Sequence, residues 1–295
     1  MSSLDYFLQL AVNGVVTGGV YALVALGLTL IFGVLGIINF AHGEFYMLGA
    51  YLGLVLVMRV GAPFFVALPL AMAGMALGGI VAERLVFRRL RRTDPTQSIL
   101  SSFGLAIALQ TAALQIFGPQ PAVIRTSFGA TPVAFAGVHL TLQRLLIPFL
   151  AAALVLLFHL LVRRTWMGLS LRAVAQNPAT ASLMGIDVNA VAAATFAIGT
   201  ALAAGAGVLI GSVFLMQPTM GSMVVLKSFT VVILGGMGNV YGAVGAGVLL
   251  GITESLTAGF LTNDFKDILA FLVVVLVLLL RPAGLFGQQV ERQSL

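Results

Sequence analysis

Long apolar runs alternate with short polar segments along the whole chain. The apolar runs cover residues 7–33, 45–59, 63–82, 97–117, 144–162, 191–215, 222–235, 240–258 and 266–280. A membrane-spanning helix needs about 20 apolar residues, and most of these runs are close to that length. Two runs, 45–59 and 222–235, are short and adjoin glycine-rich polar segments. They predict broken or tilted helices, so we expect eight to ten spans, with nine as the best count.

The composition indicates the class of protein. Hydrophobic residues make up 60% of the 295 residues and charged residues only 8%, against about 25% charged in soluble proteins. Apolar runs of this length predict an all-α polytopic membrane protein, with one transmembrane domain over residues 1–295. The roughly ten-residue alternation of a membrane β-barrel is absent. The N-terminus lacks the basic segment of a cleavable signal peptide. The chain has no Cys, which excludes disulfides and thiolate sites.

Basic residues gather in three segments and predict the orientation. Cytosolic segments of membrane proteins are enriched in Lys and Arg, which also explains the net charge of +6 without any nucleic-acid partner. We therefore expect cytosolic loops at 83–95 and 163–190, a cytosolic tail at 281–295 and an outer loop at 118–143. The N-terminus is then outside and the C-terminus cytosolic. The outer loop could form a hairpin or a lid.

A polar interruption lies between the first two apolar runs. Asn39, His42 and Glu44 fall within six positions, surrounded by glycines. Ionisable residues at membrane depth commonly mark a transport path, an ion pair or a turn at the membrane face, and transporters build binding sites from broken helices. Two interpretations remain open: these residues line or gate a path, or they form a polar turn at the cytosolic face.

The second half of the chain contains a possible counterpart of this interruption. The segment ILGGMGNVYGAVGAG also has an apolar run, a Gly/Asn break and regularly spaced glycines. Glycine pairs four residues apart also predict close helix–helix contacts. These pairs are Gly14/Gly18, Gly74/Gly78, Gly207/Gly211, Gly238/Gly242 and Gly247/Gly251.

The 163–190 segment predicts a short helix over Pro178–Met184. Asn177 suits its N-cap, Pro178 its first turn and Gly185 the position after its end. This helix would present Ala179, Leu183 and Met184 to a groove on a partner protein, or it would lie on the bilayer as an amphipathic linker.

Three segments together resemble a known transporter family. They are GVYALVALGLTLIFGVLGIINFAHGEFYMLGAY, RAVAQNPATASLMGID and KSFTVVILGGMGNVYGAVGAG. In order and spacing the chain resembles the LivH-type permease of bacterial branched-chain amino acid ABC importers. The resemblance implies a multi-pass channel subunit in the bacterial inner membrane, surrounded by lipid. It also implies a LivM-like second permease, two ATPase subunits that hold ATP and Mg²⁺, and a periplasmic binding protein.

The same resemblance assigns the short helix to coupling with the ATPase. Many ABC importers carry Glu-Ala-Ala, three further residues and Gly in this loop. Ala179, Thr180 and Ala181 occupy the triplet here, and Gly185 provides the glycine. The coupling residues are therefore expected among the following set: Asn177, Pro178, Ala179, Ala181, Leu183, Met184 and Gly185. The Glu is missing.

Other chemistry is not indicated. Gly221–Ser228 resembles a phosphate-binding loop, but Leu226 replaces the glycine that must precede the lysine. No catalytic or metal-binding pattern is present, so we expect no enzyme and no cofactor in this chain. An ion-coupled secondary transporter is the alternative class. Within the importer class, other neutral amino acids, urea or short amides are alternative cargoes.

Two charges within the later spans predict an ion pair. Lys227 and Glu254 lie on neighbouring antiparallel spans near the outer face, at depths that agree within about one helical turn. Either an ion pair between them or snorkelling of each side chain to the headgroups would lower the free-energy cost of placing these charges in the membrane. We favour pairing.

Overall fold

The computed structural model describes residues 3–91, 94–135, 138–262, 265–281 and 284–286. The predicted tail 281–295 is thus described only at Arg281 and 284–286, and Arg92 and Arg292 lie outside the described residues. In these ranges the regular structure consists of helices and one short hairpin. In order they are α1 (Ser3–Leu35), α2 (His42–Met58), α3 (Phe64–Ala82), the π-helix η1 (Glu83–Phe87), α4 (Arg88–Leu90), α5 (Pro95–Phe117), β1 (Pro132–Phe135), β2 (Val138–Thr141), α6 (Leu142–Arg164), α7 (Trp166–Gln176), α8 (Pro178–Leu183), α9 (Val188–Gly211), α10 (Met220–Gly235), α11 (Val240–Phe260) and α12 (Phe265–Leu280).

Each predicted apolar run lies largely on one helix. Among the described residues, six helices are long and apolar enough to cross a membrane. They are Leu4–Leu35, Phe64–Leu90, Thr96–Phe117, Leu142–Arg164, Val188–Gly211 and Val240–Phe260. The runs predicted to be short form α2 and α10, with 17 and 16 residues. The described chain therefore has the architecture of a polytopic helical membrane protein.

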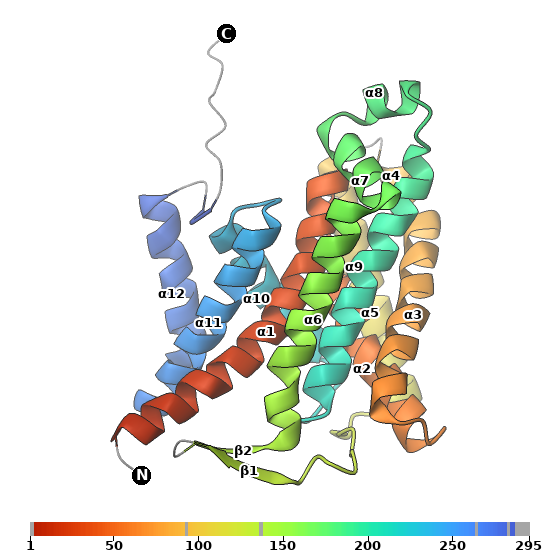
Figure 1. Cartoon of the computed structure of the whole chain (residues 1–295). Coiled ribbons are helices and arrows are strands. Elements are labelled where there is room, and N and C mark those ends of the chain that lie inside the picture. Colours follow the sequence, from red (N-terminus) through yellow and green to blue (C-terminus); the bar gives the residue numbers. More distant parts are fainter. Residues whose placement is uncertain (1–2, 92–93, 136–137, 263–264, 282–283, 287–295) are drawn as a thin grey trace.

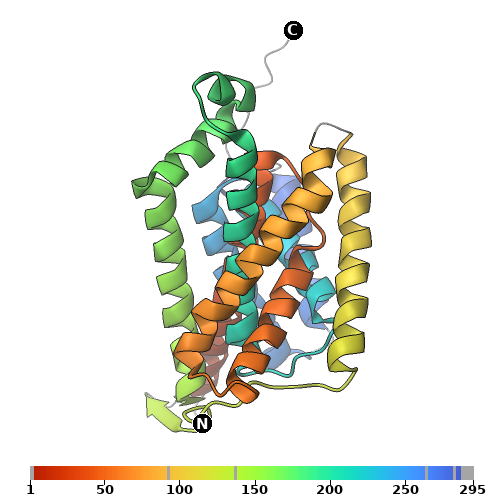
Figure 2. The ribbon, with the colours of Figure 1, turned by 90° about the vertical axis from the view of Figure 1, so that its right-hand side faces the viewer.

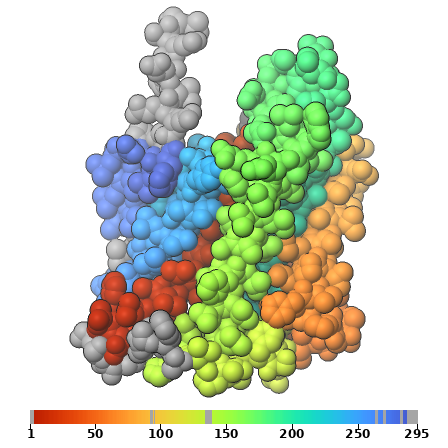
Figure 3. Space-filling view, viewed as in Figure 1, coloured from red at the N-terminus to blue at the C-terminus, as the bar shows by residue number. Residues whose placement is uncertain are grey.

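The bundle has two distinct ends. One end carries α4, α7 and α8, and we call it the α8 end (Figure 1). The other carries the start of α1 and the β1–β2 hairpin, and we call it the hairpin end (Figure 1). In the space-filling view the segment with α7 and α8, in green, projects beyond the blue helices α10 to α12 (Figure 3). The arginine-rich segments 83–91 and 163–172 thus lie at the same end.

Glycines let the central helices pack backbone against backbone. Helices α1 and α9 are the most buried of the long apolar helices, whereas α5 stands at the edge of the bundle (Figure 2). A Cβ at Gly18 would lie 2.8 Å from Val248 Cα, and one at Gly14 would lie 2.5 Å from Ile252 Cα. The predicted glycine pairs of α1 and α11 are therefore confirmed as a close helix contact. Thr200 Oγ1 of α9 donates to Met75 O of α3 at 2.8 Å, across a second helix pair.

Two segments expected to be loops are largely helical. Residues 83–90 continue α3 as η1 and α4, because Arg is a good helix former and Glu83 is paired with the arginines that follow it. The 163–190 segment holds α7 as well as the predicted short helix. The expected counterpart of the first break is a tight turn between α10 and α11, with positive φ at Gly236 and Gly238 and Asn239 as the N-cap of α11.

The segment 118–143, predicted to be an outer loop, contains a hairpin, one of its two predicted forms. β1 and β2 pair antiparallel, with Val133 opposite Leu140. An isolated bridge joins Ala122 to Met216, so the segment before the hairpin is tied to the segment between α9 and α10.

Helix α5 begins at the cap Asp94, whose carboxylate accepts from Thr96 N at 3.0 Å. This hydrogen bond lowers the pKa of the Asp94 carboxyl.

Candidate functional site

The break between α1 and α2 is buried inside the bundle. The chain leaves α1 at Gly36, which has φ +67°, and enters α2 at His42. Asn39 and His42 are fully buried and Glu44 is 1% exposed. The break therefore puts three polar side chains into the protein interior, where unpaired polar groups cost free energy.

Asn39 and His42 both hold the break in place. Asn39 Oδ1 accepts from Ala41 N at 3.0 Å, a local turn that starts α2. His42 Nε2 lies 3.2 Å from Val24 O of α1. The ring fits beside Gly27, where a Cβ would lie 2.8 Å from Nε2. Each side chain thus has one backbone contact, while Asn39 Nδ2 and His42 Nδ1 are buried without a hydrogen-bond partner in the described chain.

Glu44 has a different environment, at the meeting point of two helix N-termini. Ser222 Oγ of α10 donates to Glu44 Oε1 at 3.5 Å, while Oε2 is buried without a hydrogen-bond partner in the described chain. Gly43 and Gly221 touch directly, because a Cβ at Gly43 would lie 2.8 Å from Gly221 C. The partial positive charge of both helix starts therefore faces the carboxylate. Glu44 joins the two short helices of the bundle electrostatically.

Lys227 and Glu254 are brought together by the fold. Lys227 Nζ lies 2.8 Å from Glu254 Oε1 and 2.9 Å from Asp267 Oδ1 of α12. Tyr21 OH of α1 donates to Glu254 Oε2 at 2.9 Å, and Lys227 donates to Tyr21 OH at 3.3 Å. We call Tyr21, Lys227, Glu254 and Asp267 the ion cluster. It joins α1, α10, α11 and α12, and sequence reasoning identified two of its four members.

The short helix at the α8 end has the predicted caps. Asn177 Oδ1 accepts from Thr180 N at 3.0 Å, and Gly185 has φ +85°. The helix ends at Leu183, one residue earlier than predicted, and Met184 is its C-cap. Leu183 and Met184 are 88% and 79% exposed.

The predicted coupling residues do not all share one face of this helix. Pro178 and Ala179 are exposed together with Leu183 and Met184. Ala181 is only 4% exposed and packs into the hydrophobic core, so it cannot be presented to a partner.

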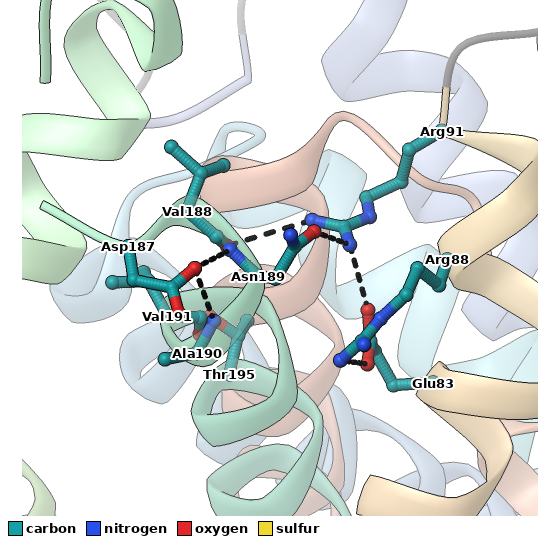
Figure 4. A network of polar contacts seen from close by, with 9 residues as sticks. All are labelled: Glu83, Arg88, Arg91, Asp187, Val188, Asn189, Ala190, Val191 and Thr195. Atoms are coloured by element: carbon teal, nitrogen blue, oxygen red, sulfur yellow. Dashed lines mark hydrogen bonds and ion pairs between the residues drawn. The ribbon is translucent and has the colours of Figure 1, made fainter. Parts of the chain in front are cut away.

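An ionic network supports this segment from η1 and α4, the short helices that continue α3. Glu83, fully buried, lies 3.1 Å from Arg88 Nη2 and 2.9 Å from Arg91 Nη2 (Figure 4). Arg91 also donates to Asn189 Oδ1 at 2.8 Å and to Val188 O at 3.5 Å. We call these contacts the Glu83 network. It fixes the start of α9, which directly follows the α8 segment, to the end of α3.

Sequence reasoning missed several residues of these sites. Asp267 and Tyr21 of the ion cluster and all members of the Glu83 network were not singled out. One signal was available: Glu83 directly precedes the arginine-rich segment 84–92. Among the described residues, no group of three or more His, Asp or Glu side chains is placed to hold a metal ion.

Comparisons with known proteins place the chain in a family. Residues 10–278 match the family described as branched-chain amino acid transport system / permease component. The chain is 35% identical to the permease protein LivH of Escherichia coli K12, over 97% of this chain and 98% of LivH. It is 34% identical to BraD of Pseudomonas aeruginosa, over 99% and 100%. LivM of Salmonella typhimurium is 26% identical over 90% of this chain and 67% of LivM. The chain therefore belongs to the family of permease components of branched-chain amino acid transport systems.

Proposed function

We propose that this chain is the transmembrane channel subunit of an ATP-driven ABC importer for branched-chain amino acids. The observation that carries the proposal is the likeness to LivH and BraD over nearly the whole length of both partners. In this role the chain forms part of the path, and ATP is hydrolysed on separate subunits. A LivM-like permease, two ATPase subunits and a periplasmic binding protein complete the importer in the inner membrane.

In the proposed topology nine helices cross or enter the membrane, with the N-terminus outside and the C-terminus in the cytosol. The α8 end is then cytosolic and the hairpin end faces the binding protein. The distribution of basic residues supports this orientation, because cytosolic segments are enriched in Arg and Lys. The described basic residues in the segments predicted to be cytosolic are Arg84, Arg88, Arg89, Arg91, Arg163, Arg164, Arg172 and Arg281.

The exposed face of α7 and α8 is the proposed ATPase contact. Leu183, Met184 and Trp166 are all more than three-quarters exposed, which is unusual for large apolar residues in a polar segment outside a bilayer. Docked on an ATPase, these side chains would fill a groove. Copurification of the tagged chain with an ATPase, followed by ATP-dependent leucine uptake in reconstituted vesicles, tests the proposal. Recovery of a complex that imports no branched-chain amino acid would contradict it.

The cargo is tested separately from the importer class. The binding protein that works with this permease should bind leucine, isoleucine or valine in a direct titration. Selective binding of urea, a short amide or a polar neutral amino acid would replace the proposed cargo and leave the importer class in place.

Replacing Gly185 with valine should uncouple ATP hydrolysis from transport. The backbone at Gly185 has φ +85°, where a β-branched residue is strained by about 1–3 kcal/mol. No heavy atom lies within 4 Å of a Cβ at this position, so the effect would come from the end of α8 and not from a clash. We expect uptake to fall severalfold while the complex still assembles and hydrolyses ATP.

Asparagine at position 185 is the matched control, because Asn tolerates positive φ better than other residues. Gly185→Asn should retain most of the coupled transport. Equal coupling ratios in the valine and asparagine variants would refute a role for the α8 end.

Replacing Glu44 with glutamine should lower uptake while assembly persists. The change keeps the shape of the side chain and removes a charge that faces two helix N-termini. The interaction of the charge with each N-terminus is worth about 1 kcal/mol. We expect the transport rate to fall roughly thirtyfold, because the two interactions together are worth about 2 kcal/mol and every 1.4 kcal/mol is about tenfold. Ser222→Ala serves as the control, since it removes only the 3.5 Å contact. Wild-type uptake in a well-assembled Glu44→Gln complex would eliminate the gating interpretation.

A further inference from the structure

A cavity of about 430 Å³ is lined by residues of α1, α2, α6, α9, α10, α11 and α12. Cavities that hold small ligands commonly have volumes of about 300–1,000 Å³. One part of its lining is apolar and comes from Val16, Val20, Ile210, Phe214 and Val224. The other part is polar and charged, with Tyr21, Lys227, Glu254, Arg144 and Lys266. A ligand of this cavity must therefore have a charged part and an apolar part.

The charges around the cavity are not balanced within the described chain. Lys227 is already paired with Glu254 and Asp267. Arg144 and Lys266 have no ion pair with a described acidic residue. The Arg144 guanidinium carbon lies 5.5 Å from the centre of the Phe214 ring, a cation–π contact that leaves its hydrogen-bond donors available. Two cations are thus available for an anionic group.

The same cavity offers acceptors for a cationic group. Glu254 is 6% exposed, and its carboxylate already accepts from Tyr21 and pairs with Lys227. A carboxylate has about four lone-pair sites, so it can accept a further donor. Cationic donors, a carboxylate acceptor and valine side chains in one lining match a small amphiphile with a carboxylate, an ammonium and a branched hydrocarbon.

We propose that this cavity binds the zwitterionic head and the branched side chain of the amino acid during its passage through the permease. Arg144 and Lys266 hold the α-carboxylate, the Glu254 side of the ion cluster accepts from the α-ammonium, and the side chain lies against Val16, Val20 and Val224. This inference rests on the proposed function and specifies where this chain recognises its cargo.

The position of the cavity fits a stage of transport. Arg144 follows directly on the hairpin strand β2, at the end proposed to receive cargo. Tyr46 of α2, two residues after Glu44, also lines the cavity. The cavity thus extends from the hairpin end to the helix that begins at the buried break. Cargo held there would stand next to the contact between α2 and α10.

The absence of cysteine from the chain allows a direct test by thiol labelling. A single cysteine in place of Val224, on the apolar wall, is labelled with a small thiosulfonate reagent in the full importer complex in detergent, without binding protein. Leucine added at rising concentration should slow the labelling of Val224→Cys several-fold. Thr131→Cys, exposed at the hairpin end and outside this cavity, should be labelled at the same rate with and without leucine.

Arg144 variants then test the proposed carboxylate contact. Arg144→Gln in the Val224→Cys background should raise the leucine concentration for half-protection about tenfold or more, as expected for a lost charge-assisted hydrogen bond. Arg144→Lys should recover part of the protection. Arg125→Gln removes an exposed cation outside the cavity and should change nothing. Recovery of the intact complex in each case shows that the variant has folded.

The outcomes separate this inference from the proposed function. If the wild-type complex imports leucine but leucine never protects Val224→Cys, or Arg144→Gln leaves half-protection unchanged, the cavity inference is overturned and the importer stands. If the wild-type complex imports no branched-chain amino acid, the proposed function fails and the inference fails with it.

Discussion

Replacing Gly251 with valine should prevent α11 from packing on α1 and remove most of the folded protein from the membrane. A Cβ at Gly251 would lie 2.5 Å from Gly14 O and would overlap the backbone of Gly18. Backbone atoms cannot rotate away as a side chain can, so the two helices would have to separate. Overpacking commonly costs about 1–3 kcal/mol and more where nothing can move. Close packing of small residues is a main source of helix association in lipid.

The chain offers a matched glycine for comparison. Gly104 lies within α5, and a Cβ there would meet no heavy atom within 4 Å. Gly104→Val should therefore leave the yield of monodisperse protein and its melting temperature near the wild-type values. Both quantities can be measured on detergent extracts of the same membranes. Similar yields for Gly251→Val and Gly104→Val would show that the α1–α11 contact is not needed for folding.

The second large effect is expected at Glu83. Replacing it with leucine should lower the free energy of unfolding by about 3 kcal/mol, the low end for breaking a buried ion pair. Arg91 would keep its bonds to Asn189 and Val188 but lose the carboxylate 2.9 Å away. The start of α9 would then be less firmly held to α3, so we also expect a lower ratio of amino acid transported to ATP hydrolysed.

The neighbouring Arg84 provides the control for this change. Arg84 is exposed and belongs to the same π-helix, so Arg84→Gln should leave both stability and coupling unchanged. Adding Arg91→Leu to Glu83→Leu should restore part of the stability, because the double change leaves no unpaired buried charge. If the double variant loses as much free energy of unfolding as the two single variants lose together, the result would argue against a coupled network.

Local chemistry explains which elements could be predicted from the sequence. The start and end of α8 follow from Asn177, Pro178 and Gly185, which act on atoms within a few residues of themselves. The apolar runs predict the long helices for the same reason. The Lys227–Glu254 interaction could be proposed because both charges lie on neighbouring apolar runs that are expected to be antiparallel. Matching depths then reduced the choice of partners.

Interactions between distant segments explain what the sequence did not reveal. Glu83 and Asn189 are far apart in sequence and meet through Arg91, so no local pattern points to their contact. Arg144 and Lys266 look like ordinary residues at the ends of spans and only the fold places them around one cavity. The π-helix also has no simple sequence signature. The glycines of 235–238 predict a second break, yet the same residues suit a tight turn between antiparallel helices.

Helix α9 runs without interruption from Val188, shortly after α8, to Gly211, next to Ile210, which lines the cavity. One rigid element therefore touches both the proposed ATPase contact and the proposed cargo site. If docking at α8 changes the affinity of the cavity for leucine, thermodynamic linkage requires leucine to change the affinity of docking by the same factor. An amino acid bound in the membrane would then act as a signal to the ATPase. The coupling factor can be measured either as the change in leucine affinity on docking or as the change in docking affinity on leucine binding.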